Sequence, residues 1–281
     1  MLFVSGTKRS GTSMWMQVLR AAGFPVLGEA FPRGFNEALH QANPAGFYES
    51  ILRHGVYFRT NPHPVTGEYF LPEHVEGYVV KVFVPGVIRS ERAYITHLIA
   101  NVREWREYEA SVVRLYALER EGMAAAGQPV PEASTYFPPA YEWWMENFAL
   151  VRDISLRRYP ARLMTYDQVL DDPVGTLTGV LAWLGRGDLA AALPTIQPAF
   201  RTQTRPTSDS VPPALARVFD NLYAAVAAAR PFPESLLRDL NATNRALLPE
   251  LTEIQRRVAL AQANAPKGPP PPRPAGLPEL D

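Results

Sequence analysis

The residues best suited to chemistry stand near the start of the chain, in the run Ser5-Gly6-Thr7-Lys8-Arg9-Ser10-Gly11-Thr12-Ser13. The apolar run Leu2–Val4 precedes this stretch, and a sequence typical of a helix follows it from Met14. A Gly- and Ser-rich turn at a helix N-terminus leaves backbone N–H groups unpaired at the positive end of the helix dipole. The segment Gly6–Ser13, called the anion loop below, therefore predicts a site for phosphate or sulfate. A strand–turn–helix with a purely structural role is the alternative.

The positive charge of the anion loop has an unusual position. Gly6 and Gly11 have the spacing of the first two conserved glycines in a Walker loop, but Thr12 and Ser13 follow, where a nucleotide-binding loop has Lys and then Ser or Thr. The basic residues Lys8 and Arg9 lie inside the loop instead. The lysine that reaches the β- and γ-phosphates of a nucleoside triphosphate is thus missing. A P-loop kinase or NTPase remains an alternative that the spacing alone leaves open.

A second set of candidates comes later in the chain. Arg103 follows the predicted strand Tyr94–Asn101, and Ser111 lies eight residues further on, in the first turns of the next predicted helix. In a parallel sheet both positions fall at the carboxyl edge, which is also the edge of the anion loop. A cation and a hydroxyl there suit a second phosphate. Lys81 lies in the apolar predicted strand Tyr78–Val84, where its ammonium group needs an anion or access to water.

The elements that must position these residues alternate between strands and helices. This alternation predicts an α/β, three-layer, P-loop-like fold with a central, mostly parallel sheet flanked by helices. After the two strands above, the patterns predict helices from about Trp105, over Ala140–Tyr159 and over Pro173–Leu184, a strand over Arg162–Tyr166, and amphipathic helices over Leu215–Val226 and Leu240–Val258. Pro249 is expected to divide or kink the last helix. The irregular region Phe31–Pro72 is expected to shape a substrate pocket.

Composition limits the classes of protein that fit. The 281 residues include 28 basic and 28 acidic side chains, so no overall field favours nucleic acid or a membrane surface as a partner. The absence of cysteine excludes disulfides, a cysteine nucleophile and thiolate metal sites. Because no run of about 18 apolar residues and no secretion signal is present, we expect a soluble, cytoplasmic protein. We expect one domain over residues 1–263, with a helical C-terminal part at about 187–263, and a disordered Pro-rich tail over 264–281.

Taken together, these stretches resemble the sulfotransferase family that uses 3′-phosphoadenosine-5′-phosphosulfate (PAPS), in its bacterial type, over about residues 1 to 205. The anion loop is similar to the family's 5′-phosphosulfate loop, in which a Lys or Arg precedes Ser-Gly-Thr-Thr/Ser, and Arg9 occupies that basic position. Lys81–Pro85 is similar to the family's second basic strand, and Arg103 with Ser111 has its Arg-x7-Ser spacing for the 3′-phosphate. Tyr166–Pro173 and Leu181–Gly185 are similar to stretches that come late in these domains.

The resemblance implies a reaction and a set of site residues. The reaction is a metal-independent, in-line transfer of the sulfuryl group from PAPS to a hydroxyl or amine of a small-molecule, glycan or peptide acceptor. Arg9 and Lys81 would stabilise the developing charge. The implied donor-binding residues are Lys8, Arg9, Ser10, Gly11, Thr12, Ser13, Arg103, Ser111 and Arg201. Lys8 stands where many relatives have Pro, so a non-catalytic protein that binds PAPS or its product PAP stays an alternative.

The residue at the position where family members often have the general base departs from the commonest pattern. Cytosolic members often have a His two residues after the strand lysine, but Phe83 stands there and cannot accept a proton. Other branches use a Glu shortly after the first helix, which makes Glu29 the first candidate. Glu49 is the second candidate, and three histidines of the same irregular region rank lower: His40, His54 and His63.

Overall fold

A five-stranded parallel sheet forms the centre of the protein. The computed structural model describes residues 1–31, 43–201, 203, 206–229 and 232–265. The sheet has the strand order β2-β3-β1-β4-β5, and every neighbouring pair is parallel. Its strands are β1 Leu2–Ser5, β2 Val26–Leu27, β3 Val79–Lys81, β4 His97–Val102 and β5 Ala161–Thr165. The predicted α/β class is confirmed.

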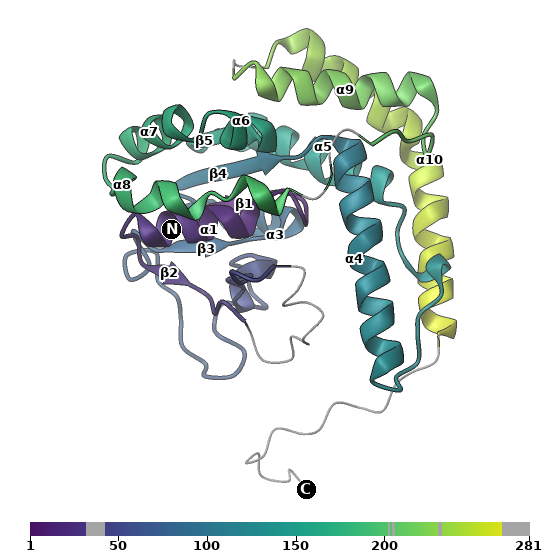
Figure 1. The fold of residues 1–281 in the computed structure, drawn as a ribbon, viewed down its shortest axis with the longest axis horizontal. Coiled ribbons are helices and arrows are strands. Elements are labelled where there is room, and N and C mark those ends of the chain that lie inside the picture. The colour runs from purple at the N-terminus through teal and green to yellow at the C-terminus, as the bar shows by residue number, and fades with distance from the viewer. Residues whose placement is uncertain (32–42, 202, 204–205, 230–231, 266–281) are drawn as a thin grey trace, which may run out of the picture.

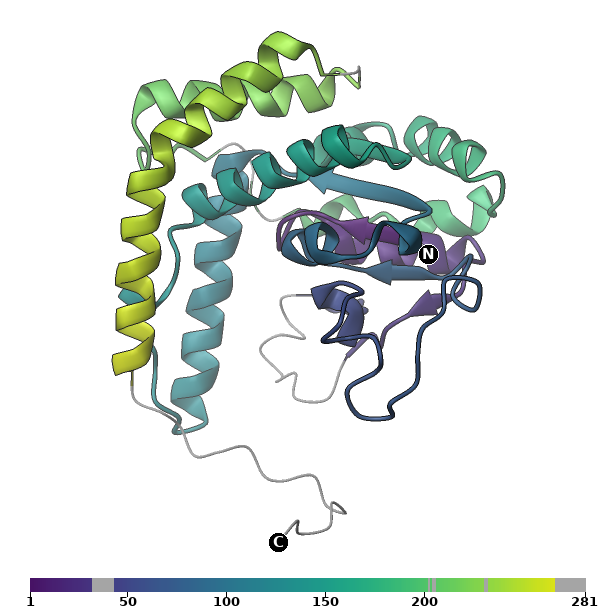
Figure 2. The same cartoon turned by 180° about the vertical axis from the view of Figure 1, so that it is seen from behind.

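Helices cover both faces of this sheet (Figures 1 and 2). Their bounds are α1 Thr12–Ala21, α3 Val84–Arg89, α4 Trp105–Ala125, α5 Pro139–Arg157, α6 Tyr166–Asp171, α7 Pro173–Leu184, α8 Leu189–Ala192, α9 Pro213–Ala227 and α10 Glu234–Asn264. Leu2 and Val4 of β1 pack with α1, α7 and α8, whereas Phe3 packs on the opposite face with α3 and α5. This alternation is the period of two that a strand buried on both faces must have. The three predicted layers are therefore present.

Two predicted strands are shorter than their apolar runs. β3 ends at Lys81, and α3 begins at Val84 with Pro85 in its first turn. Proline suits this position because the first N–H groups of a helix have no intrahelical partner. The run from Tyr94 begins as a 3-10 turn, and β4 starts only at His97. The predictions were wrong at these boundaries, and the shortening of β3 places Lys81 at the carboxyl edge of the sheet.

The C-terminal helices α9 and α10 pack against α4 and α5. Their core joins Phe219 and Leu251 to the buried tryptophans Trp105, Trp143 and Trp144. Figure 1 shows that α4 and the second half of α10 run side by side beyond the sheet. α10 continues through Pro249 as one helix, and Figure 2 shows it bending between its two halves, as the proline predicts.

The Pro-rich tail over 264–281 lies almost wholly outside the described residues, which end at 265. Within the described ranges, no helix combines the length and the apolar character that crossing a bilayer requires.

Candidate functional site

The anion loop connects β1 to α1 at the carboxyl edge of the sheet, as predicted. Its backbone has a positive φ at Gly6, Arg9 and Gly11. The Ser10 hydroxyl donates to the Thr7 carbonyl at 2.7 Å, and the Asn101 amide at the end of β4 donates to the Ser10 carbonyl at 2.6 Å. A Cβ atom on Gly11 would lie 2.9 Å from the Asn101 side chain. The loop is therefore a tight, internally bonded turn held against β4.

The N-terminus of α1 opens into this loop without a competing anion. Gly11 is the N-cap residue, no side chain caps the helix, and its first turn contains no acidic residue. The first N–H groups of a helix lack intrahelical acceptors and attract negative charge. This is the donor set that a phosphate or sulfate group requires.

Arg9 and Arg103 bring the two predicted anion-binding groups together. The Arg9 guanidinium donates from Nε to Ser111 Oγ at 3.3 Å, and Arg103 donates to the Arg9 carbonyl at 3.1 Å. Arg103 is 5% exposed, lies over the Tyr166 ring and pairs with Glu107 at 3.4 Å. Burial, followed by repulsion from Arg103, lowers the pKa of Arg9. Two guanidinium groups thus share one small region beside the loop.

Lys81 reaches the same region from the end of β3. Its side chain is buried, and Nζ donates to Glu49 Oε1 at 3.1 Å, to the Phe47 carbonyl at 3.0 Å and to Ser13 Oγ at 3.2 Å. Burial lowers the pKa of Lys81, and the Glu49 carboxylate opposes that shift. The ammonium group therefore links the segment 43–49 to the first turn of α1.

Lys8 supports the anion loop from outside. Its ammonium group donates to the Tyr116 hydroxyl of α4 at 2.8 Å and pairs with Glu142 of α5 at 2.9 Å. Burial lowers the pKa of Lys8, whereas the charge of Glu142 and the hydrogen bond to Tyr116 raise it. The raising effects are the larger, so the pKa of Lys8 lies above the ordinary lysine value. Because this charge is engaged by α4 and α5, Lys8 braces the loop.

Arg201 lies at the edge of this network. It pairs with Glu107 at 2.6 Å and with Asp167 at 2.9 Å. Glu107 is therefore shared between Arg201 and Arg103. This carboxylate connects Arg201 to the second anion-binding group.

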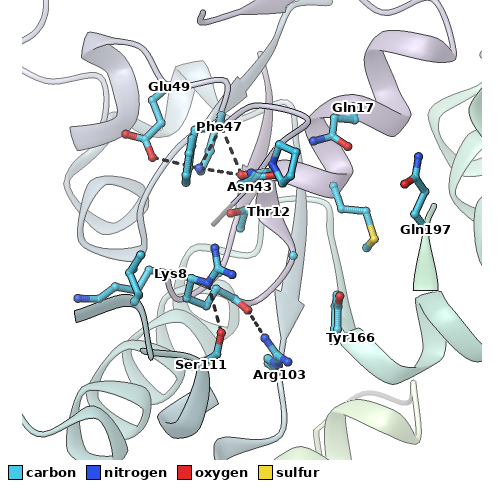
Figure 3. A pocket seen from close by; sticks show the side chains of 18 of the residues that line it. Lys8, Thr12, Gln17, Asn43, Phe47, Glu49, Arg103, Ser111, Tyr166 and Gln197 are labelled. Atoms are coloured by element: carbon cyan, nitrogen blue, oxygen red, sulfur yellow. Dashed lines mark hydrogen bonds and ion pairs between the residues drawn. The ribbon is translucent and has the colours of Figure 1, made fainter. Parts of the chain in front are cut away.

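A cavity of about 420 Å³ joins these residues (Figure 3). Among its lining residues are most of the predicted ones: Lys8, Arg9, Gly11, Thr12, Ser13, Lys81, Arg103 and Ser111. Ser10 and Arg201 do not line it; the Ser10 side chain is buried within the loop. Figure 3 shows Gln17, Gln197 and Tyr166 toward one end of the cavity, and Lys8 and Glu49 toward the other.

The candidate bases differ in whether they line the cavity. Glu29 is exposed and does not line the cavity; its backbone pairs with that of Glu49, each N–H donating to the other residue's carbonyl at 3.2 Å. The Glu49 carboxylate does line the cavity. His54 and His63 are not lining residues, and His40 falls outside the described residues.

Several lining residues were not foreseen as site residues. They include Gln17, Arg114, Leu118, Glu119, Thr195 and Gln197. The lining residues Asn43, Pro44 and Phe47 belong to the irregular region Phe31–Pro72, which was expected to shape a pocket. Part of the signal was present, because Arg114, Leu118 and Glu119 share a helical face with Ser111. Leu115 is only half-buried and also borders the cavity.

Possible metal ligands do not gather in the described part of the chain. Within those ranges, no group of three or more His, Cys, Asp or Glu side chains is arranged to hold an ion.

Comparisons with known proteins find similarity to solved structures. No family model matches the chain, and no curated protein matches it. Among solved structures, it is similar to the sulfotransferase domain from the curacin biosynthetic pathway, with a TM-score of 0.39 and 15% identity over 73% of this chain and 80% of that chain. It is also similar to the sulfotransferase domain from the Synechococcus PCC 7002 olefin synthase, with a TM-score of 0.40 and 16% identity over 83% and 95%. Both similarities are weak.

Proposed function

We propose that this protein transfers the sulfuryl group of PAPS to a hydroxyl or amine group of an acceptor. One observation carries the proposal: a single cavity contains both the anion loop at the N-terminus of α1 and a second cationic group at Arg103. Arg103 donates to the Arg9 carbonyl, and Arg9 donates to Ser111 at 3.3 Å. PAPS bears a phosphosulfate at its 5′ end and a phosphate at its 3′ position. Two anion-binding groups in one cavity suit its two ends.

The residues around the loop fit this donor chemically. The uncapped N–H groups of α1 and the Thr12 and Ser13 hydroxyls would hold the 5′-phosphate, and Arg9 would contact the sulfuryl oxygens. Arg103 and Ser111 would hold the 3′-phosphate. Fixed positive charges placed where negative charge develops lower the barrier without reorganising during the reaction.

The transfer needs a proton acceptor and a group beside the leaving oxygen. A bond forms between the acceptor oxygen or nitrogen and sulfur while the bond from sulfur to the 5′-phosphate oxygen breaks, and its electron pair leaves with PAP. The acceptor's proton passes to a base, for which we propose Glu49 in place of Glu29, because Glu49 lines the cavity and Glu29 does not. Lys81, 3.1 Å from Glu49 and 3.2 Å from Ser13, would stabilise charge on the leaving oxygen.

Binding of PAP tests the donor site directly. We expect PAP to raise the melting temperature to the same extent with and without EDTA, since a ligand that binds only the folded state adds about 2.7 kcal/mol at 100 times its Kd. No shift with PAP would contradict both a catalytic and a non-catalytic PAPS-binding role. A shift with ATP and Mg²⁺ but none with PAP would favour the P-loop kinase or NTPase.

Substitution of Arg9 tests catalysis. We expect Arg9→Ala to slow sulfuryl transfer from PAPS by about 100- to 1,000-fold, the cost of removing one preorganised donor to developing charge. The matched control is Arg152→Ala, because Arg152 is exposed on α5 and does not line the cavity. Circular dichroism and melting temperature check folding. PAP binding without transfer by the unsubstituted protein would favour the non-catalytic alternative.

A further inference from the structure

One face of α4 extends the cavity away from the anion loop. The lining residues Ser111, Arg114, Leu115, Leu118 and Glu119 have the spacing i, i+3, i+4, i+7 and i+8, which places them in one stripe of the helix. The stripe starts at Ser111, which contacts Arg9. With a rise of about 1.5 Å per residue, it runs about 12 Å outward. The part of the cavity beyond Arg9 is therefore bounded by α4.

Several apolar side chains line the cavity. Leu115 and Leu118 contribute from α4, and Phe83, Pro44 and Phe47 line the same cavity from other segments. A cavity wall of this kind favours a ligand with an apolar body next to its reacting group.

Arg114 differs from three other cations of the cavity. Lys8, Lys81 and Arg103 each pair with a carboxylate, on Glu142, Glu49 and Glu107 respectively. Among the described residues, Arg114 has neither a hydrogen bond nor an ion pair, and its side chain is exposed at the cavity. Its charge nevertheless reaches the reacting region, because it contributes, after burial and Arg103, to lowering the pKa of Arg9.

From this arrangement, and resting on the proposed sulfuryl transfer, we propose that the acceptor is an anionic hydroxy compound. Its hydroxyl group lies at Arg9, its apolar body packs against Leu115 and Leu118, and its carboxylate or phosphate pairs with Arg114. Arg114 is then the residue that selects the acceptor's charge. Glu119, further along the stripe, would instead favour a cationic acceptor, so the test must include one.

Three phenols of similar size test the proposal: 3-(4-hydroxyphenyl)propionate, its neutral amide and the cationic tyramine. We expect the PAP complex to bind the propionate about fivefold more tightly than the amide, as a partly exposed ion pair allows. We expect the same order in kcat/KM with PAPS. Arg114→Gln should abolish this preference. Arg120→Gln is the matched control and should keep it, because Arg120 is exposed on the same helix but does not line the cavity.

Each other outcome overturns the inference. Equal or absent binding of the three phenols to the PAP complex does so, and a preference for tyramine would assign selection to Glu119. An Arg114→Gln variant that loses PAPS affinity but keeps the preference for the propionate would place Arg114 at the donor. The proposed function has a separate readout, since it fails only if the unsubstituted protein does not bind PAP or does not transfer the sulfuryl group.

Discussion

Glu49 and Lys81 are the two side chains placed to handle a proton and a leaving group. Their charged atoms lie 3.1 Å apart, both side chains line the cavity, and Lys81 is almost fully buried. A buried ammonium group without a partner is costly, so the pair also keeps Lys81 in place. This double role makes Glu49 sensitive to small changes in chemistry.

We predict that Glu49→Gln lowers the rate of sulfuryl transfer by about 100- to 1,000-fold, because an amide cannot accept a proton. PAP affinity should change little, since the Gln oxygen still accepts a hydrogen bond from Lys81. Glu29→Gln is the matched control and should leave the rate unchanged. Steady-state rates and PAP titrations check both variants. A larger loss in Glu29→Gln than in Glu49→Gln would contradict the assignment of the base.

At the scale of single residues, the sequence predicts those whose roles depend on a local sequence pattern. Arg9 and Gly11 belong to a continuous loop motif, and Arg103 with Ser111 belongs to one strand end and the helix after it. The contact of Lys81 with Glu49 joins positions 32 residues apart through the fold. No local pattern distinguishes Glu49 from Glu29, because the difference is which side chain faces the cavity.

At the scale of elements, α4 and α5 hold the anion loop through Lys8. α5 also places two carboxyl groups close together there, because Glu142 and Glu146 lie one turn apart. Burial, together with repulsion from Glu142, raises the pKa of Glu146 to about 8. Glu146 is therefore largely protonated at neutral pH in the folded protein.

This shift predicts a pH dependence of stability. Between the ordinary pKa of a glutamate and about 8, the folded protein binds the Glu146 proton more tightly than the unfolded chain does. The free energy of unfolding therefore falls as the pH rises through this window. Glu146→Gln removes the effect, so the variant should match the original protein near pH 5 and exceed it by about 4 kcal/mol near pH 9, the value that a shift to about 8 gives at about 1.4 kcal/mol per pKa unit.

Denaturant unfolding at several pH values measures this difference. Glu121→Gln, on the neighbouring helix α4 but exposed, is the control and should show no such trend. A Glu146→Gln variant whose stability gain is independent of pH would contradict the raised pKa.

Element boundaries show where sequence patterns stop being informative. The strand–loop–helix at the start and the helix after Asp172 follow the predictions, because glycines, caps and apolar periods agree there. The apolar runs Tyr78–Val84 and Tyr94–Asn101 each contain a turn as well as a strand. Because the turn is also largely buried, its residues are as apolar as those of the strand. Hydrophobicity alone cannot mark the end of a strand inside a core.

At the scale of the whole molecule, an aromatic cluster joins the sheet domain to the C-terminal helices. The ring centroid of Phe219 on α9 lies 5.7 Å from that of Trp105, 5.1 Å from Trp143 and 5.4 Å from Trp144. Trp143 also donates to the Arg103 carbonyl at 2.8 Å. The packing of α9 therefore supports the strand end that carries Arg103.

We predict that Phe219→Ala destabilises the protein by about 3 to 5 kcal/mol, the usual cost of removing a buried aromatic ring. Because the core is shared, calorimetry should show one transition at a lower temperature. Leu248→Ala, at a half-exposed position of α10, should have a small effect. Two separate transitions, with only one of them shifted, would contradict the prediction of a single domain over residues 1–263.

If one cavity holds both ends of PAPS, the protein must distinguish PAP from AMP. AMP has the 5′-phosphate but lacks the 3′-phosphate that Arg103 and Ser111 would bind. We predict, from isothermal titration, that PAP binds at least about tenfold more tightly than AMP, as a charge-assisted contact to the extra phosphate allows. Ser111→Ala should reduce this ratio while leaving the Kd of AMP nearly unchanged. Equal affinities for PAP and AMP in the unsubstituted protein would contradict the account.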